Sequence, residues 1–131
     1  MIVVLDASAG IRAVFDPRPP KPVLRSLANA DLVLAPQSYI AETANALIKY
    51  VRMHHLTAEM AKDVHGKALA LVNNFHSHLE LITEAIDLAA KEGSVYDALY
   101  LVLARRHAAT LLTTDAALAA SARKLRIRVP S

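Results

Sequence analysis

The amino-acid sequence predicts an α/β fold, with helices on both faces of a mostly parallel sheet. Short apolar segments alternate with helical patterns along the chain, as they do in right-handed strand–helix–strand units. The first apolar segment, residues 2–5, is an unbroken Ile-Val-Val-Leu run, which is typical of a strand buried on both faces. The 131 residues are 54% hydrophobic, enough to bury the core of one domain over residues 1–131.

Five segments have the apolar content and length of strands: residues 2–5, 32–35, 79–82, 110–113 and 127–129. Asp6 ends the first of these, and a first helix is predicted directly after it. A proline-rich loop at residues 17–22 then leads to a short helix at residues 23–30.

The remaining helices are predicted from capping residues and apolar spacing. Pro36 is a suitable first residue for a helix at 36–53, and Thr57 is a suitable N-cap for the next. The apolar stripe after Thr57 consists of Met60, Val64, Ala68, Leu71, Val72 and Phe75. Three further helices are predicted at residues 84–92, 94–107 and 116–125, with Gly93 placed to end the first of them.

Composition excludes several classes of protein. With no cysteine and only three glycines, the chain lacks thiolate chemistry, dinucleotide-binding and Walker glycine motifs, and the serine hydrolase nucleophile motif. The longest stretch without a charged residue, residues 68–79, has 12 residues, too few to cross a membrane. No basic segment precedes the first apolar run, as one would in a secretory signal. We therefore expect a cytoplasmic protein with no membrane span.

The cationic residues favour no single interpretation. The formal net charge is only +3. The basic side chains gather in two clusters, one of Arg105, Arg106 and His107 and one of Arg123, Lys124, Arg126 and Arg128. Each cluster fits either favourable charge near a helix C-terminus or a surface that contacts phosphates.

Four carboxylates stand at informative positions. Asp6 directly follows the first strand and Asp115 follows the fourth, and the carboxyl ends of parallel strands share the edge where ligands bind. Glu42 and Asp97 lie near the starts of two predicted helices. If those helices begin at the same edge, all four acids converge there.

Each acid also has an ordinary structural role open to it. Asp115 is a natural N-cap for the helix after it, and Ser94 with Asp97 fits a capping box. Glu42 fits an exposed acid paired with a nearby base. Asp6 fits such a role less well, because an unpaired carboxylate at the end of a buried strand is costly.

Convergent carboxylates predict a metal ion. Two carboxylates ~4 Å apart repel by about 4 kcal/mol at an effective dielectric constant near 20, so a cluster of them needs a neutralising cation. An all-oxygen donor set without cysteine favours Mg²⁺ or Mn²⁺ over zinc. Such a site suits hydrolysis of a phosphodiester, in which the metal activates water and stabilises charge on the phosphate.

Four motifs in this order resemble the PIN domain, and in particular the VapC toxins. They are Asp6-Ala7-Ser8, Glu42-Thr43-Ala44-Asn45, Val95-Tyr96-Asp97-Ala98-Leu99-Tyr100 and Leu111-Leu112-Thr113-Thr114-Asp115. The resemblance extends from residue 1 to about residue 129. It implies a three-layer α/β/α sandwich on a parallel sheet of four or five strands, and an endoribonuclease that depends on Mg²⁺ or on Mn²⁺ in its place.

The resemblance also implies site residues. The family's acidic positions, catalytic and metal-binding, correspond to Asp6, Glu42, Asp97 and Asp115, and its supporting polar positions to Ser8 and Thr113. Asp6, Asp97 and Asp115 would hold the metal, with Glu42 orienting or deprotonating the attacking water. Where many relatives have another acidic or polar residue, this chain has Ala116, Ala117 and Leu118, which argues against a stably bound second metal.

The implied partners are an RNA substrate, a second copy in a homodimer and a cognate VapB-like antitoxin that covers the acidic site. The apolar stripes of the helices at 36–53 and after Thr57 fit a dimer or antitoxin groove as well as they fit a buried helix pair. Two other functions stay open: a housekeeping PIN nuclease of RNA processing and a PIN binding module with weak catalysis.

Overall fold

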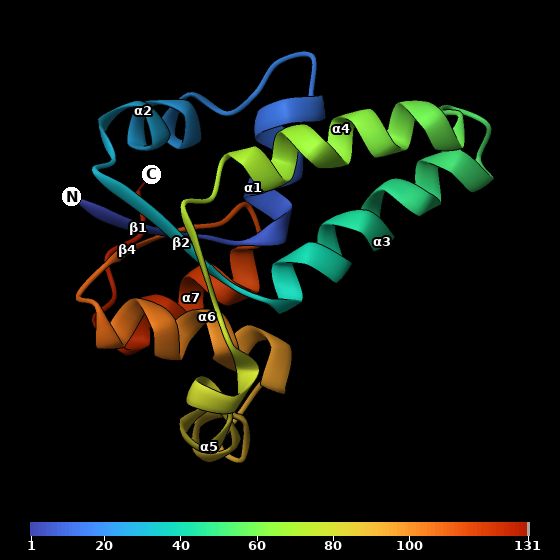
Figure 1. Ribbon diagram of the computed structural model, residues 1–131. Helices are drawn as coiled ribbons and strands as arrows, with labels where there is room; N and C mark the ends of the chain where they lie inside the picture. The colour runs from blue at the N-terminus through green and yellow to red at the C-terminus, as the bar shows by residue number, and fades with distance from the viewer. Residues whose placement is uncertain (131) are drawn as a thin grey trace.

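The computed structural model describes residues 1–130 and places four strands in one sheet between two layers of helices (Figure 1). The strands are β1 (Ile2–Leu5), β2 (Leu32–Pro36), β3 (Asn74–His76) and β4 (Thr110–Leu112). Their order is β3-β2-β1-β4, and every pairing is parallel. The winding reverses between β1 and β4, which is the position where open parallel sheets bind ligands. The predicted α/β/α sandwich is confirmed.

Seven helices flank the sheet within the described residues: α1 (Ala7–Phe15), α2 (Lys21–Asn29), α3 (Ser38–Arg52), α4 (Ala58–Ala70), α5 (His78–Ala89), α6 (Val95–Arg106) and α7 (Ala116–Lys124). None of these helices has the length and apolar content needed to span a bilayer.

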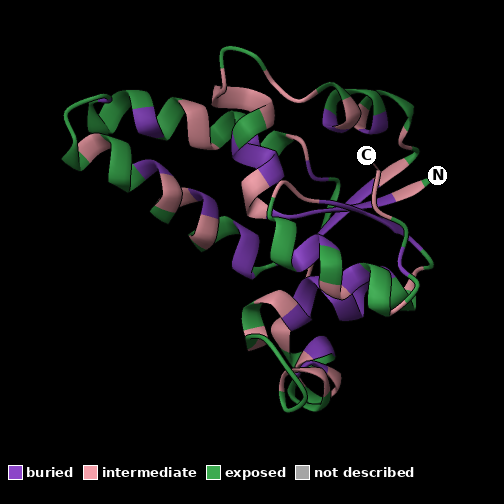
Figure 2. Cartoon of the chain, turned by 180° about the vertical axis from the view of Figure 1, so that it is seen from behind, coloured by how far each residue is buried: buried purple, intermediate pink, exposed green. Residues whose placement is uncertain are grey.

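The core lies on both faces of the sheet because successive strand residues point to opposite sides. Val4 and Leu34 pack with residues of α5, α6 and α7. Val3 and Val33 point the other way and pack with residues of α1, α2 and α3. Helix α6 is the central element of its layer, with residues 98–104 all buried, whereas the outer ends of α3 and α4 are largely exposed (Figure 2).

The predicted strand at residues 79–82 is wrong, because these residues lie in α5. Ser77 is the N-cap of this helix, and Leu81 and Ala85, one turn apart, are fully buried. The sequence does contain a signal for this helix, because Glu80 follows Ser77 by three residues, as in a capping box. The apolar run is one face of a helix and not a strand. The predicted helix at 84–92 consequently began six residues too late.

The third strand is the short segment β3, and its position corrects two further predictions. Phe75 lies in β3 and not in the apolar stripe of α4, which ends at Ala70. Pro36 is the last residue of β2, where it pairs with His76, and α3 begins only at Ser38. A proline is tolerated at this strand end because only one ladder donor is lost.

Two predictions near the ends of elements are also wrong. Residues 127–129 do not form a fifth strand; the backbone N–H of Leu111 donates to the carbonyl of Arg128 at 2.9 Å, and this bond holds the segment against β4. Gly93 does have the positive φ of +80° expected of a helix-ending glycine. However, α5 ends at Ala89, so Gly93 belongs to the turn between α5 and α6.

Candidate active site

Asp6 is the N-cap of α1, directly after β1, and is only 5% exposed. Its Oδ1 accepts hydrogen bonds from the backbone N–H of Ala9 at 2.9 Å and from the hydroxyl of Ser8 at 2.8 Å. Its Oδ2 accepts from the hydroxyl of Thr113 at 2.6 Å. Burial raises the pKa of Asp6, and these hydrogen bonds oppose the rise. Ser8 and Thr113 therefore hold the carboxylate in one orientation.

Asp115 is the N-cap of α7, on the other side of the point where the winding reverses. Its Oδ1 accepts from the backbone N–H groups of Ala117 at 2.9 Å and Leu118 at 3.2 Å. The hydroxyl oxygen of Thr113 accepts from the backbone N–H of Asp115 at 3.0 Å while donating to Asp6. One threonine thus links the two acids that follow β1 and β4.

Glu42 is half-buried on α3 and faces Tyr100 of α6. The Tyr100 hydroxyl donates to Oε1 of Glu42 at 3.2 Å. Burial raises the pKa of Glu42, and the negative charges of Asp6 and Asp97 raise it further. The buried hydroxyl of Ser38, one turn earlier, lies near enough to lower this pKa, yet its oxygen has no partner of good hydrogen-bond geometry among the described residues.

Asp97 lies in the first turn of α6. Its backbone N–H donates to the hydroxyl of Ser94 at 3.1 Å, as in the predicted cap. The Ser94 hydroxyl also lies near enough to the Asp97 carboxylate to lower its pKa. Burial and the charge of Asp115 raise the pKa of Asp97. Asp97 is therefore a half-buried acid that lies near enough to Asp115 and Glu42 for their charges to interact.

The four predicted acids come from four different elements and lie at the same edge of the sheet, where they repel one another. Asp115 raises the pKa values of both Asp6 and Asp97. Over residues 1–130, none of the four forms an ion pair. The capping roles of Asp6 and Asp115 are real, but Glu42 is not the exposed, paired acid considered as an alternative. The negative charge at this edge is thus not neutralised by an ion pair with any residue in the described part of the chain.

The chemistry of these oxygens fits a divalent metal, although they do not form a ready-made metal site. In the described part of the chain, no three His, Asp or Glu side chains are grouped closely enough to hold an ion as they stand. Among the described residues, the hydrogen bonds of good geometry leave Oε2 of Glu42, Oδ2 of Asp115 and the Asp97 carboxylate available, with the Ser94 hydroxyl near Asp97. Mg²⁺ commonly takes one or two carboxylates and keeps several waters, so this donor set suits it.

Tyr100 and Ser38 are site residues that the sequence did not single out. Tyr100 follows Asp97 by three residues, so the two lie on neighbouring positions of α6, and this spacing was a usable signal. Burial and the charge of Glu42 raise the pKa of Tyr100, which keeps its hydroxyl protonated as a donor. Ser38 carries no comparable signal, because its burial beside Glu42 depends on how α3 and α6 pack.

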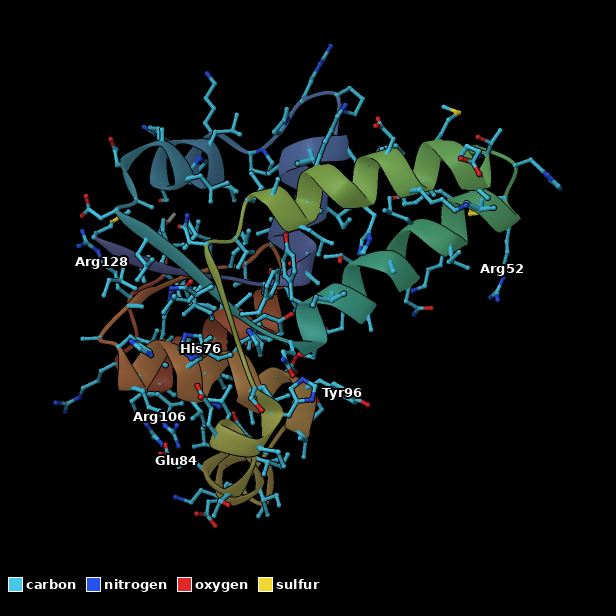
Figure 3. All side chains as sticks on the ribbon, in the orientation of Figure 1. Arg52, His76, Glu84, Tyr96, Arg106 and Arg128 are labelled. Atoms are coloured by element: carbon cyan, nitrogen blue, oxygen red, sulfur yellow. The ribbon has the colours of Figure 1, made fainter. Side chains whose placement is uncertain are left out.

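Arg105, Arg106 and Arg128 of the two basic clusters lie outside this edge, whereas Lys124 lines a pocket that also includes Asp97. Arg105 and Arg106 both pair with Glu84 of α5, the shorter contact joining Nη2 of Arg106 to Oε1 at 2.9 Å. Arg128 lies at the end of the sheet where β1 begins, opposite the end that carries Asp6 (Figure 3). The arginines paired with Glu84 thus match the structural interpretation of a solvated helix face.

A parallel sheet of this order, with acids at the carboxyl ends of β1 and β4, defines the class of protein. The model of the family described as PIN domain matches residues 3–124, and the chain belongs to this family. Its sequence is 30% identical to Ribonuclease VapC1 of Mycobacterium tuberculosis over 118 residues, which cover 90% of this chain and 89% of VapC1. The resemblance drawn from the four motifs is confirmed.

Solved structures support the same fold. The crystal structure of PAE2754 from Pyrobaculum aerophilum matches with a TM-score of 0.69 at 21% identity, over 98% of this chain and 83% of that one. The crystal structure of VapC20 of Mycobacterium tuberculosis, described as a sarcin-ricin loop cleaving toxin, matches with a TM-score of 0.66 at 18% identity. This second match covers 91% of this chain and 94% of VapC20.

Proposed function

We propose that this protein is a metal-dependent endoribonuclease of the VapC type, which hydrolyses RNA at the site formed by Asp6, Glu42, Asp97 and Asp115. The observation that carries the proposal is the group of mutually repelling carboxylates that form no ion pair in the described part of the chain. The 30% sequence identity of this protein to Ribonuclease VapC1, over 90% of the chain, supports RNA as the substrate class.

Each residue has a distinct role in the proposed reaction. Asp6, Asp97 and Asp115 would hold Mg²⁺ or Mn²⁺, directly or through water. When bound, the ion would lower the pKa of a coordinated water molecule and stabilise negative charge on the phosphate. Tyr100 fixes one oxygen of Glu42 and leaves the other to orient or deprotonate the attacking water. Ser8 and Thr113 keep the Asp6 carboxylate in place.

We also propose that the protein is the toxin of a toxin–antitoxin pair and forms a homodimer. VapC20, a structural relative, is described as a toxin. Ile40 and Ile48 of α3 and Met60 of α4 stay exposed at 39%, 38% and 51%, so the predicted apolar stripes are not fully used by the core. This uncovered surface supports contact with a VapB-like antitoxin or with a second copy.

The test is cleavage of a labelled RNA pool by the purified protein with Mg²⁺, with Mn²⁺ and with EDTA, beside the Asp97→Asn variant. RNA cleavage should require a metal. The cleavage rate should fall at least ~100-fold in Asp97→Asn, because losing even a residue that only hydrogen-bonds to a metal ligand typically costs about 10- to 100-fold in activity. The melting temperature of Asp97→Asn should be equal or higher, because the substitution relieves repulsion from Asp115.

Asp87→Asn is the matched control, since Asp87 is an exposed acid on α5 whose charge does not shift the pKa of Asp6, Glu42 or Asp97. It should cleave like the wild type. A fully active Asp97→Asn enzyme would refute the assigned site. A folded wild-type protein that cuts no RNA with either metal would instead favour a binding module.

A further inference from the structure

A groove of about 650 Å³ extends from the candidate active site between α1 and α3, and we call it the α1–α3 groove. Its inner end is lined by Ser8, Glu42 and Thr114. Its outer part is lined by Arg12, Lys49 and Tyr50, among others. The lining residues of α3 run from 42 to 50, and Met53 directly after the helix extends the lining, so the groove follows α3 for about 12 Å at 1.5 Å per residue.

The charge of the groove changes sign along its length. Glu42 is acidic at the inner end, and Lys49 follows it two helical turns later, about 10.5 Å along the axis. Lys49 pairs with no acid in the described residues. Arg12 faces the same groove from α1. A polyanion that reaches the carboxylates along this path therefore passes two cations first.

Arg12 forms an ion pair with Asp16, the C-cap residue of α1. Its Nε and Nη2 atoms both lie 3.1 Å from Oδ2 of Asp16, four residues later. The side chain nevertheless stays 48% exposed and lines the groove. Asp16 thus orients Arg12 and offsets part of its charge, so the electrostatic strength of the groove depends on Asp16.

Tyr50 adds an aromatic surface to the outer part of the groove. Its ring packs edge-on against Phe15 of α1, with centroids 5.0 Å apart at 65°, which fixes its orientation. About a third of the residue remains exposed. Basic side chains beside an exposed aromatic ring are the combination by which proteins bind single-stranded nucleic acid, the cations holding phosphates and the ring stacking on a base.

We propose that the α1–α3 groove is the path of single-stranded RNA to the carboxylates, with Lys49 and Arg12 contacting phosphates beyond the cleaved one and Tyr50 stacking on a base. The inference rests on the proposed nuclease function, since it assigns the substrate path of that site. Because these contacts involve phosphates and a base face, they favour no particular sequence.

The test is binding of a fluorescent oligouridylate of about twelve nucleotides, followed by anisotropy in EDTA at several KCl concentrations. Lys49→Gln should weaken binding about threefold or more and lower the slope of log K against log[salt] by about 0.7. Asp16→Asn should tighten binding about two- to fivefold, because it releases Arg12 from an exposed ion pair. These two substitutions act in opposite directions.

Arg52→Gln is the matched control, because it removes one positive charge from the same helix. Arg52 does not line the groove, and its side chain points away at the far end of α3 (Figure 3). It should leave affinity and salt slope unchanged. If Lys49→Gln and Asp16→Asn both match Arg52→Gln, the groove is not the RNA path, and a protein segment becomes its better occupant. A wild type that binds RNA in this manner but cleaves none with metal would overturn the nuclease proposal alone.

Discussion

Thr113 shows how one hydroxyl organises the acidic edge. It donates to Oδ2 of Asp6 and accepts from the backbone N–H of Asp115, so it spans the acids that follow β1 and β4. Ser8 adds a second link, since its hydroxyl donates to Asp6 and accepts from the backbone N–H of Thr114 at 3.1 Å. The Thr-x-Asp and Asp-x-Ser patterns of the sequence thus describe one hydrogen-bonded unit.

The raised pKa values of Asp6, Glu42 and Asp97 predict an unusual pH dependence. A carboxyl group whose pKa is raised by folding adds stability below its unfolded pKa, and this contribution is lost as the pH rises through the folded pKa. In metal-free protein, the melting temperature should therefore rise as the pH falls from neutral toward the ordinary carboxyl pKa of about 4, because these groups take up protons more readily in the folded state. Thermal unfolding in EDTA across this range measures it.

The trend should reverse under more acidic conditions. Asp16, Asp31 and Glu84 have lowered pKa values because of cationic or N–H partners, so their stabilisation is lost as the pH falls through those values. Asp6→Asn should flatten the rise that precedes this reversal. A melting temperature that falls steadily from neutral pH into the ordinary carboxyl range at about pH 4 would contradict raised pKa values at the acidic edge.

At the scale of elements, the packing of α1 against α3 depends on Gly10. A Cβ atom at this position would lie 2.3 Å from the hydroxyl oxygen and 2.9 Å from Cε2 of Tyr39. Tyr39 is fully buried, and its hydroxyl donates to the carbonyl of Ala68 at 2.7 Å, so the ring has no room to move away. The absence of a side chain at residue 10 is what lets these helices approach.

Gly10→Ala should therefore destabilise the protein by about 1–3 kcal/mol, as expected for overpacking in a closed core. Gly66→Ala is the control, because nothing lies within 4 Å of its added Cβ and α4 is helical there. That variant should gain about 0.5–1 kcal/mol from lower backbone entropy in the unfolded chain. Urea unfolding of both variants measures the difference, and equal stabilities would contradict the packing argument.

At the scale of the whole molecule, four acids gather at one edge of the sheet. Two core layers hold the sheet from both sides, and the acids lie where the winding reverses between β1 and β4. Within the described residues no cation of the protein neutralises them, so a bound divalent ion would act on the stability of the entire fold.

Mg²⁺ should therefore raise the melting temperature. At about 100 times its Kd, a ligand that binds only the native state adds about 2.7 kcal/mol, which is several degrees for a domain of this size. The shift should be much smaller in Asp97→Asn. Thermal unfolding with MgCl₂ and with NaCl of equal ionic strength separates binding from screening. An equal shift in the two salts would argue against a metal site.

Much of the fold and site was predictable because the signals are local. The apolar run before Asp6, the Thr57 and Ser94 caps and the acid after β4 are each recognisable within a few residues. The error at residues 79–82 was also local, since four apolar-rich residues fit a strand or one helical face equally well. The short strand β3 has Phe75 as its one large apolar residue, too little to identify it.

The sequence by itself determined the α/β class, the buried first strand and the acids at helix starts, because periodicity and capping act between residues close in the chain. Only the tertiary structure decided that β4 pairs with β1, that Tyr100 meets Glu42 and that Lys49 and Arg12 line one groove. These contacts join elements far apart in sequence. Their partners are chosen by strand pairing and by the burial of whole helix faces, which no local pattern specifies.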